Sequence, residues 1–448
     1  MLNPKVFKAY DIRGVYGVDW DAAGAALIAR AFIEKFEIKQ LVLGWDMRVS
    51  SPEMVAAIET AAVEMGVHLV KVGLVTTPVL YFATIGISGN DGGIMVTASH
   101  NTGEWNGMKF LLGDGTPVGE ASGLLDVKEL ALRGEFKNAA AVGTVETRDV
   151  IENCFDVLFS KVTFDASKPV SVVIDCGNGM EGAVIHQLLA RIPSVSAHVM
   201  YDTPDGTFPH HEANPLKEET LEDLRHEVVA RGAAVGIAFD GDGDRIGFVD
   251  ERGVQVSGDV LTGLIACELL KSNPGATILY DLRSRSAVGR AITGNGGRAI
   301  MSRVGHTFIK KQMREVGAIF AGELAGHFYF KDYFGVECSD MVLLLILNLL
   351  QSSGKPLSEL ASDFLSDSHS GEINFAVEDR AAALARIEEM YAPIAAKITK
   401  IDGLLFEMGD WWFSVRPSNT EPLLRLILEA RDEMTMREKI IEVQSLIV

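Results

Sequence analysis

Short apolar runs alternate with amphipathic segments along most of the chain. The run at 41–45 ends in a polar loop, and the segment 51–66 that follows has helical spacing with Ser51 in the capping position. Comparable strand-like runs begin at residues 68, 92, 169 and 275. The repeated order of strand, loop and helix predicts an α/β fold.

The chain is too long for one hydrophobic core, so several domains are expected. Three strand-and-loop units of similar design predict three comparable α/β domains. From about Gly371 the pattern changes to strand, helix, strand, loop, strand, helix, which is typical of a smaller α+β domain. No low-complexity linker is visible, so the domains should pack closely. The predicted ranges are 1–150, 151–252, 253–367 and 368–448.

Composition narrows the class of protein. Of the 448 residues, 48% are apolar and 23% are charged, which is ordinary for a soluble protein. No run of about 18 apolar residues lacks charges or breaks, so no membrane span is expected. The first residues lack the apolar run of a secretory signal. We therefore expect a cytoplasmic protein with no membrane partner.

The cysteines argue against a disulfide-stabilised or zinc-binding protein, and the net charge argues against a nucleic-acid-binding protein. Cys154, Cys176, Cys267 and Cys338 are scattered without a C-x-x-C spacing, which favours free thiols over disulfides or a zinc site. A formal charge of −20 argues against nucleic acid as the main partner. It does not exclude a small anionic ligand, because such a ligand responds to the local potential of its site.

The acidic loop AFDGDGDRIGFVDE carries the strongest chemical signal. Asp240, Asp242 and Asp244 alternate with glycines, and carboxylates this close repel one another unless a cation holds them together. Glycine permits the tight backbone that points all three at one centre, and oxygen ligands suit magnesium or calcium. The alternative of a solvated acidic turn fits poorly with the apolar flanks.

An EF-hand loop is the other calcium-binding alternative for this segment. Glu251 does occupy the twelfth position of such a loop. However, Arg245 stands where an EF-hand needs glycine, and the following IGFV continues as a strand. A metal site of another kind is therefore predicted.

Three more loops contain reactive or ligand-binding residue types. Each motif, taken alone, fits both a functional and a purely structural role. Ser99 and His100 come shortly after the apolar run at 92–96, where the serine is a nucleophile, a helix cap or a turn residue. Glu323 and His327 lie in a glycine-containing loop that suits a polyol, although single acids and histidines are more often structural. The fourth loop either supplies hydrogen-bond donors to a bound phosphate or forms an ordinary β-turn. Its residues are Arg416, Ser418, Asn419 and Thr420.

Five motifs in order make the chain resemble a known family. They are KAYDIRG at the start, TASHN, DGDGDR, GE-x-x-GH and RPSNTEP. Their sequence and approximate spacing resemble the α-D-phosphohexomutase superfamily, in particular its bacterial phosphomannomutase/phosphoglucomutase branch, over essentially the whole chain. The segment DGTFPHHEANP from Asp205 also looks like a family segment, so His210 and His211 need not be metal ligands.

The resemblance implies a fold and a reaction. The fold is four domains around a central cleft, with the last domain mobile. The enzyme, an isomerase, interconverts hexose 6-phosphates and 1-phosphates reversibly, through a phosphoserine and a 1,6-bisphosphate that turns around in the cleft. Magnesium is the expected cofactor, and glucose 1,6-bisphosphate or mannose 1,6-bisphosphate is the expected activator. The expected partner is a phosphosugar, and the assembly is a monomer or a homodimer.

Residue roles are also implied by the resemblance. Ser99 carries the phosphoryl group, with His100, Lys109 and Arg13 as further catalytic residues. The implied magnesium ligands are Asp240, Asp242, Asp244 and an oxygen on Ser99. The implied substrate-binding residues are Tyr10, Arg245, Arg283, His306, Glu323, Ala325, His327, Arg416, Ser418, Asn419 and Thr420. The general base is Lys109, His327 or Arg13, and Lys109 is favoured.

One residue departs from the family pattern. The family usually has serine in GE-x-S-GH, whereas this chain has Ala325. The change removes a hydroxyl from the loop that reads the sugar, and a neutral hydrogen bond is worth about 0.5–1.5 kcal/mol. A weaker or shifted sugar specificity is therefore expected, without loss of activity.

Three other functions compete with this interpretation. Phosphoglucosamine mutase shares the scaffold, but its members usually have glycine where this chain has Asn419 and begin with a different motif. A non-catalytic phosphosugar sensor should lack the serine or an aspartate, and all four residues are present here. A metal-dependent phosphatase leaves the TASHN and RPSNTEP loops unexplained.

Overall fold

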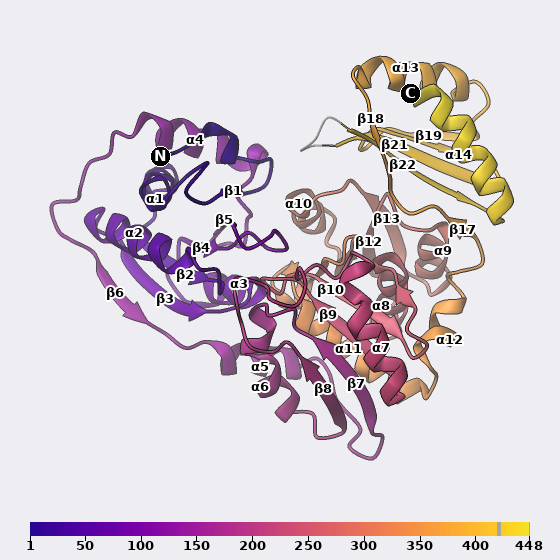
Figure 1. The fold of residues 1–448 in the computed structure, drawn as a ribbon, viewed down its shortest axis with the longest axis horizontal. Coiled ribbons are helices and arrows are strands. Elements are labelled where there is room, and N and C mark those ends of the chain that lie inside the picture. The colour runs from indigo at the N-terminus through magenta and orange to yellow at the C-terminus, as the bar shows by residue number, and fades with distance from the viewer. Residues whose placement is uncertain (419–422, 448) are drawn as a thin grey trace.

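The computed structural model describes residues 1–418 and 423–447, which form four sheets with helices packed around them (Figure 1). Three of the sheets combine parallel and antiparallel strands, and the fourth is antiparallel. The predicted four-part α/β architecture with a C-terminal α+β domain is confirmed.

The first sheet has the strand order β1-β5-β4-β2-β3-β6. Its strands are β1 (Ile12–Val15), β2 (Gln40–Trp45), β3 (His68–Leu74), β4 (Gly92–Val96), β5 (Trp105–Leu112) and β6 (Thr144–Thr147). Its helices are α1 (Ala22–Phe36), α2 (Ser51–Glu64), α3 (Thr77–Gly86) and α4 (Leu124–Arg133). The predicted cap at Ser51 is wrong: Ser50 holds the capping position without a side-chain bond, and the Ser51 hydroxyl instead donates to Asp46 Oδ1 at 2.8 Å.

The second sheet has the order β11-β10-β9-β7-β8, and the third has the order β13-β12-β14-β15-β16. The second unit contains α5 (Ile151–Phe159), β7 (Val170–Asp175), α6 (Ile185–Ala190), β8 (Val195–Met200), α7 (Glu222–Arg231), β9 (Val235–Phe239), β10 (Ile246–Asp250) and β11 (Gln255–Val256). The third contains α8 (Gly258–Ser272), β12 (Thr277–Asp281), α9 (Ser286–Gly294), β13 (Arg298–Ser302), α10 (His306–Val316), β14 (Phe320–Gly322), β15 (Phe328–Phe330), β16 (Val336–Glu337), α11 (Ser339–Ser353) and α12 (Leu357–Ser362).

The C-terminal sheet has the order β17-β22-β21-β20-β19, with β18 also paired to β22. Its elements are β17 (Ser368–His369), β18 (Ile373–Ala376), α13 (Arg380–Tyr391), β19 (Lys397–Thr399), β20 (Leu404–Glu407), β21 (Trp411–Pro417), β22 (Leu423–Ala430) and α14 (Glu433–Ile447). The sequence pattern anticipated the two helices and the long strands. It missed the short strands β17, β19 and β20, because runs of two to four residues have little readable periodicity.

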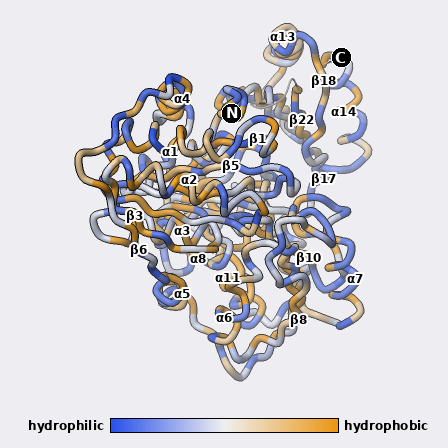
Figure 2. Tube along the Cα trace, turned by 60° about the vertical axis from the view of Figure 1, so that its left-hand side comes forward, coloured by the Kyte–Doolittle hydropathy of each residue, from blue (hydrophilic) through white to orange (hydrophobic). Residues whose placement is uncertain are grey.

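One hydrophobic cluster spans the first three units, and the first unit buries a second cluster of its own. The last unit has a separate cluster and also meets the third unit in a small one formed by Leu282, Leu405, Trp412 and Ile427. A single cluster of buried residues runs from Val42 in the first sheet to Phe364 after α12. The C-terminal unit buries a separate cluster between its sheet, α13 and α14. Figure 2 shows hydrophobic residues along α3, α8 and α11 in the middle of the molecule. Shared packing of this kind holds the first three units at fixed relative positions.

The predicted chemical loops occupy equivalent places in the first three units. In each, a strand parallel to its neighbour ends, a loop follows, and the chain returns as an antiparallel strand: β4 to β5, β9 to β10, and β14 to β15. Crevices beyond the carboxyl ends of parallel strands are the usual ligand sites of α/β proteins. Among the described residues, no helix is both long and apolar enough for a transmembrane span.

Candidate active site

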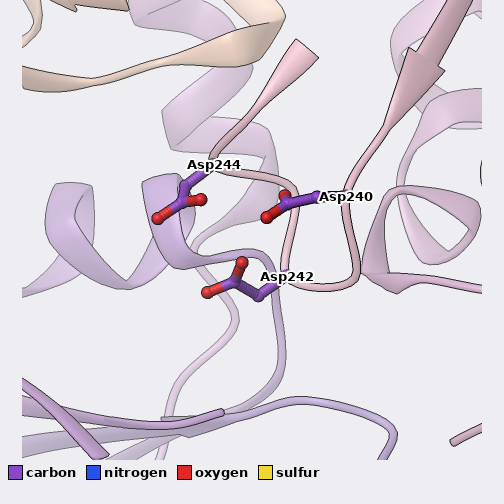
Figure 3. Close-up of side chains that lie close together, drawn as sticks. All are labelled: Asp240, Asp242 and Asp244. Carbon is purple, nitrogen blue, oxygen red and sulfur yellow. The ribbon is translucent and has the colours of Figure 1, made fainter. Parts of the chain in front are cut away.

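The acidic loop joins β9 to β10 and brings three carboxylates together. Oxygens of Asp240, Asp242 and Asp244 lie within 4.8 Å of one another, and all three residues are buried. Figure 3 shows the three side chains converging from one tight turn. Gly243 within this turn has a φ of +71°, a conformation that glycine adopts without strain. The predicted convergence of the three aspartates is confirmed.

The carboxylates of this loop shift each other's pKa values. Burial and the neighbouring Asp242 and Asp244 raise the pKa of Asp240 to about 8. Burial also acts to raise the pKa of Asp244, but Lys109 and His327 outweigh it and hold that pKa well below its usual range. Carboxylates packed this closely need a cationic partner.

Several features of the loop fit a hard divalent cation. Among the described residues, Oδ1 of Asp242 and Oδ1 of Asp244 are buried and have no hydrogen-bond partner. Carboxylate oxygens are the ligands that magnesium and calcium prefer. The donor set is therefore suited to magnesium.

Lys109 reaches the acidic loop from β5. Its Nζ lies 2.7 Å from Asp242 Oδ2 and also contacts Asp244 Oδ2. Burial lowers the pKa of Lys109, but Asp242 and Asp244 outweigh burial and raise it above its usual value. A protonated ammonium donates and cannot accept a proton, so the predicted role of Lys109 as general base requires that it first lose a proton, which these two carboxylates oppose.

Ser99 lies directly against the acidic loop, although 141 residues separate it from Asp240. The Ser99 hydroxyl donates to Asp240 Oδ2 at 2.7 Å. The loop backbones also meet closely, since a Cβ at Gly241 would lie 2.5 Å from the Ser99 carbonyl oxygen. Ser99 has a φ of 52°, so its backbone is left-handed, and its amide donates to Thr97 Oγ1 at 2.9 Å. It is a buried residue of a strained turn and caps no helix, which excludes the capping alternative.

His100 and Arg13 flank the serine. His100 Nδ1 lies 3.1 Å from Ser99 Oγ, and burial together with Arg245 and Arg13 keeps the pKa of His100 well below its usual value. Arg13 on β1 donates to Asp11 Oδ2 and to Asn101 Oδ1, both at 2.8 Å. The imidazole beside the serine is therefore neutral at pH 7, while Arg13 supplies a fixed positive charge.

The third loop, between β14 and β15, meets the acidic loop through a histidine. Glu323 Oε2 accepts from Tyr329 at 2.7 Å and lies 3.1 Å from His327 Nδ1, while His327 Nε2 lies 3.5 Å from Asp244 Oδ1. Burial and Arg245 lower the pKa of His327, but Asp244 and Glu323 outweigh them and raise it to about 9. Loops from three separate sheets thus meet at one centre.

Each of the four units matches a family model. The models describe phosphoglucomutase/phosphomannomutase α/β/α domains I, II and III, at residues 4–133, 149–253 and 257–367, and the C-terminal domain, at residues 372–440. The chain belongs to the phosphoglucomutase/phosphomannomutase family.

Curated relatives and a solved structure agree with this assignment. A phosphomannomutase of Methanocaldococcus jannaschii is 39% identical over 445 residues, which cover 99% of this chain and 97% of the relative. The phosphomannomutase/phosphoglucomutase of Pseudomonas aeruginosa (strain PAO1) is 36% identical over 439 residues, or 96% of this chain and 93% of the relative. A family protein from Burkholderia thailandensis superimposes with a TM-score of 0.92 at 31% identity, covering 100% of this chain and 97% of that one. The enzyme is a phosphohexomutase, an isomerase.

In this phosphohexomutase, the fourth predicted loop begins at the end of β21. Arg416 is buried and donates to Glu372 Oε2 at 2.7 Å, and its Nη1 lies 3.9 Å from Asp402 Oδ2. The Ser418 amide donates to the carbonyl of Leu423 at 2.9 Å. Asn419 and Thr420, which were predicted to bind phosphate, lie outside the described residues.

Glu372 is a residue that the sequence analysis missed. It links the predicted ligand residue Arg283, 3.9 Å away, to Arg416 at 2.7 Å and Arg425 at 3.0 Å. Burial acts to raise the pKa of Glu372, but Arg283 and Arg416 hold it below its usual value, so the carboxylate stays charged. A lone Gly-Glu pair before a strand carries no sequence signal for this role.

Two further predicted ligand residues, Tyr10 and His306, meet at the start of α10, whereas Arg245 donates from Nε to His327 Nε2 at 3.1 Å beside the acidic loop. Tyr10 and His306 make an edge-to-face contact with ring centroids 5.5 Å apart. His306 Nδ1 lies 3.4 Å from Glu337 Oε1, and the fully buried Lys310 holds the other oxygen at 2.5 Å. Lys310 and Glu337 were also missed, because a helical Lys next to another Lys resembles an ordinary surface position.

Proposed function

We propose that this chain interconverts the 6-phosphates and 1-phosphates of mannose and glucose through a phosphoserine at Ser99. The observation that carries the proposal is the 2.7 Å hydrogen bond from the Ser99 hydroxyl to Asp240 Oδ2. A buried serine hydroxyl therefore lies against a donor set suited to magnesium, which supports the proposal. Phosphoryl transfer depends mostly on position and on balancing charge, which this arrangement supplies.

The proposed reaction runs in two balanced transfers. In the first, the bond between phosphorus and Ser99 Oγ breaks and Ser99 Oγ takes up a proton, while a bond forms from phosphorus to the sugar's free hydroxyl oxygen and that hydroxyl's proton passes to a general base. The resulting 1,6-bisphosphate turns around. In the second transfer the bond between its other phosphorus and the sugar oxygen breaks, a bond forms to Ser99 Oγ, the serine proton passes to a base, and the sugar oxygen takes up a proton. A bound magnesium ion at Asp240, Asp242 and Asp244 would balance the charge of the moving group.

Other side chains have proposed roles in holding the substrate. Arg416 and Ser418, with Asn419 and Thr420, would hold the phosphate that is not transferred, and the charged Glu323 would accept hydrogen bonds from sugar hydroxyls. The residues proposed to line the remaining cleft are Tyr10, Arg13, Lys109, Arg245, Arg283, His306, Ala325 and His327. Glucose or mannose 1,6-bisphosphate would act as activator, by phosphorylating Ser99.

We further propose a cytoplasmic enzyme, monomeric or homodimeric, with domain boundaries near residues 150, 252 and 368. The boundaries are supported by the four separate sheets, since each predicted range contains the strands of one sheet, except that β11 (Gln255–Val256) of the second sheet lies just beyond the boundary at 252.

Turnover assays test the proposed function. Mannose 1-phosphate and glucose 1-phosphate should both be converted in the presence of magnesium and catalytic glucose 1,6-bisphosphate. Glucosamine 1-phosphate should be converted at least about 10-fold less efficiently in kcat/KM. Conversion of glucosamine 1-phosphate alone would instead assign the phosphoglucosamine branch, and steady phosphate release without isomerisation would indicate a phosphatase.

Restoring the usual serine tests the sugar-reading loop. Ala325 is half-buried and lines a cavity of about 360 Å³ together with Leu324, Arg283 and Glu372. Ala325→Ser adds one neutral hydrogen bond worth about 0.5–1.5 kcal/mol. We expect kcat/KM to rise by about twofold to 10-fold for one sugar relative to the other. Competition between mannose 1-phosphate and glucose 1-phosphate measures this ratio.

The exposed Ala190, at the end of α6, provides the control for this substitution. Ala190→Ser should leave the ratio of the two sugars unchanged. An unchanged ratio in Ala325→Ser as well would show that residue 325 does not read the sugar.

A further inference from the structure

Arg48, in the loop after β2, is a buried cation that has no assigned role. Its side chain is 0% exposed. The guanidinium donates to Asp46 Oδ2 at 3.0 Å through Nε. Its other four bonds go to backbone carbonyls of the following residues: Ser99 at 2.8 Å, Asn101 at 2.6 Å, Thr102 at 2.7 Å and Trp105 at 3.0 Å. All five guanidinium N–H groups are therefore satisfied.

These bonds hold the Ser99 loop in its unusual shape. The loop leaves β4, passes through the left-handed backbone of Ser99 and turns back into β5. The four carbonyls point inward to a single planar group, because a guanidinium presents a rigid fork of donors. Lysine, with one small ammonium group, cannot meet all four carbonyls at once.

A turn from the second unit covers the other side of Arg48. It spans residues 205–208, within the DGTFPHHEANP segment that the proposed reaction leaves without a role. The Phe208 ring lies 5.2 Å from the Arg48 guanidinium carbon, and Phe208 has a φ of 51°. A Cβ at Gly206 would lie 2.5 Å from the Arg48 Cα, so only glycine permits this approach.

The same turn also touches the Ser99 loop and the acidic loop. A Cβ at Gly103 would lie 2.6 Å from the carbonyl oxygen of Gly206. A Cβ at Gly241, between Asp240 and Asp242, would lie 3.5 Å from Phe208 Cζ. The turn is therefore in contact with Arg48, with the loop that Arg48 holds and with the loop that carries the aspartates.

We propose that Arg48 and the turn at 205–208 are positioning residues that set Ser99 against the acidic loop across the boundary of the first two units. The inference rests on the proposed function, because it assigns these residues to the phosphoserine step. Phosphoryl transfer needs in-line geometry, and a displacement of about 1 Å can cost about 100-fold in rate. Neither Arg48 nor Phe208 needs to touch the sugar for this role.

Two substitutions with matched controls test the positioning role. Arg48→Lys keeps the charge and removes the fork, and Phe208→Leu removes the ring from the guanidinium. Arg252→Lys is the matched control for the arginine, because Arg252 also pairs with the aspartate two residues earlier, at 2.7 Å, but is 60% exposed. Phe334→Leu is the control for the ring, because Phe334 has a similar left-handed φ of 59°.

The readouts are the rate of Ser99 phosphorylation by glucose 1,6-bisphosphate, kcat, KM and magnesium affinity. Arg48→Lys should lower the phosphorylation rate and kcat by about 100-fold, and Phe208→Leu by about 10-fold. KM should stay within about threefold, because the loop at Arg416 is untouched, and the magnesium affinity of the unphosphorylated enzyme should change little, because all three aspartates remain. Both controls should behave as wild type.

The outcomes separate this inference from the proposed function. If Arg48→Lys does not fold, the milder Phe208→Leu decides, provided that its thermal unfolding matches wild type. A folded Arg48→Lys or Phe208→Leu with wild-type kcat, or a loss confined to KM, would overturn the positioning role. If Ser99→Ala remained active, the phosphoserine itself would fail, whereas an inactive Ser99→Ala beside wild-type Arg48→Lys and Phe208→Leu would overturn only the positioning role.

Discussion

Ser99→Ala should lower kcat by about 1,000-fold or more, because the proposed phosphoryl group then has no acceptor. The substitution deletes only the hydroxyl that donates to Asp240 and lies beside His100. The fold should survive, since alanine tolerates the left-handed backbone of residue 99 about as well as serine does. A coupled assay with mannose 1-phosphate measures the loss, and intact-mass spectrometry measures the phosphoryl group.

Two controls accompany this prediction. One substitutes a surface serine, and the other locates the phosphoryl group in the wild-type protein. Ser88→Ala, at an exposed position between α3 and β4, should retain full turnover. Wild-type protein incubated with glucose 1,6-bisphosphate should gain one phosphoryl group, located on the peptide that contains Ser99. Substantial turnover by Ser99→Ala, or a stable phosphoryl group on another residue, would refute the phosphoserine mechanism.

Asp242→Asn should lower kcat by about 1,000-fold and should remove the effect of magnesium on stability. Asp242 supplies one carboxylate of the buried triad, and its Oδ1 has no hydrogen-bond partner among the described residues. In wild type, magnesium at 100 times its Kd should stabilise the folded state by about 2.7 kcal/mol. Chelation by EDTA should therefore lower the melting temperature of wild type and leave that of the variant almost unchanged.

The change in melting temperature distinguishes a carboxylate that binds a metal from one that supports the fold. Asp242→Asn removes one of three mutually repelling charges but also one buried partner of Lys109, which keeps its contact with Asp244, so without magnesium the variant should unfold close to the temperature of wild type. Asp363→Asn, at an exposed position after α12, should keep the response to EDTA. A variant that melts much lower and still responds to EDTA would show that Asp242 supports the fold and does not bind the ion. Differential scanning fluorimetry and titration calorimetry give both values.

Local sequence patterns were sufficient for much of the architecture. The strands β2, β4, β7 and β12 appear as apolar runs, and the loops that follow β4, β9 and β14 appear as polar motifs. The convergence of Asp240, Asp242 and Asp244 was also predictable, because residues two apart in one tight turn are neighbours whatever the rest of the chain does. These features depend on periodicity and turn chemistry, which act over a few residues.

The partners of these loops depend on how distant segments pack. The Ser99 hydroxyl meets Asp240 across 141 residues, and the carboxylate of Glu372 joins Arg283 to Arg416. Arg48 stands in an ordinary polar loop of the sequence, and only the folded chain brings four carbonyls to its guanidinium.

The chain's own motifs thus determined the class of fold, the acidic triad and the type of each chemical loop. Packing between the units decided which loop faces which, which charges pair and which residues hold the serine in place. The physical reason is that hydrophobic periodicity specifies which face of an element is buried, but not the element against which it is buried. That choice depends on the complementary shape of whole domains, to which every part of the buried core contributes.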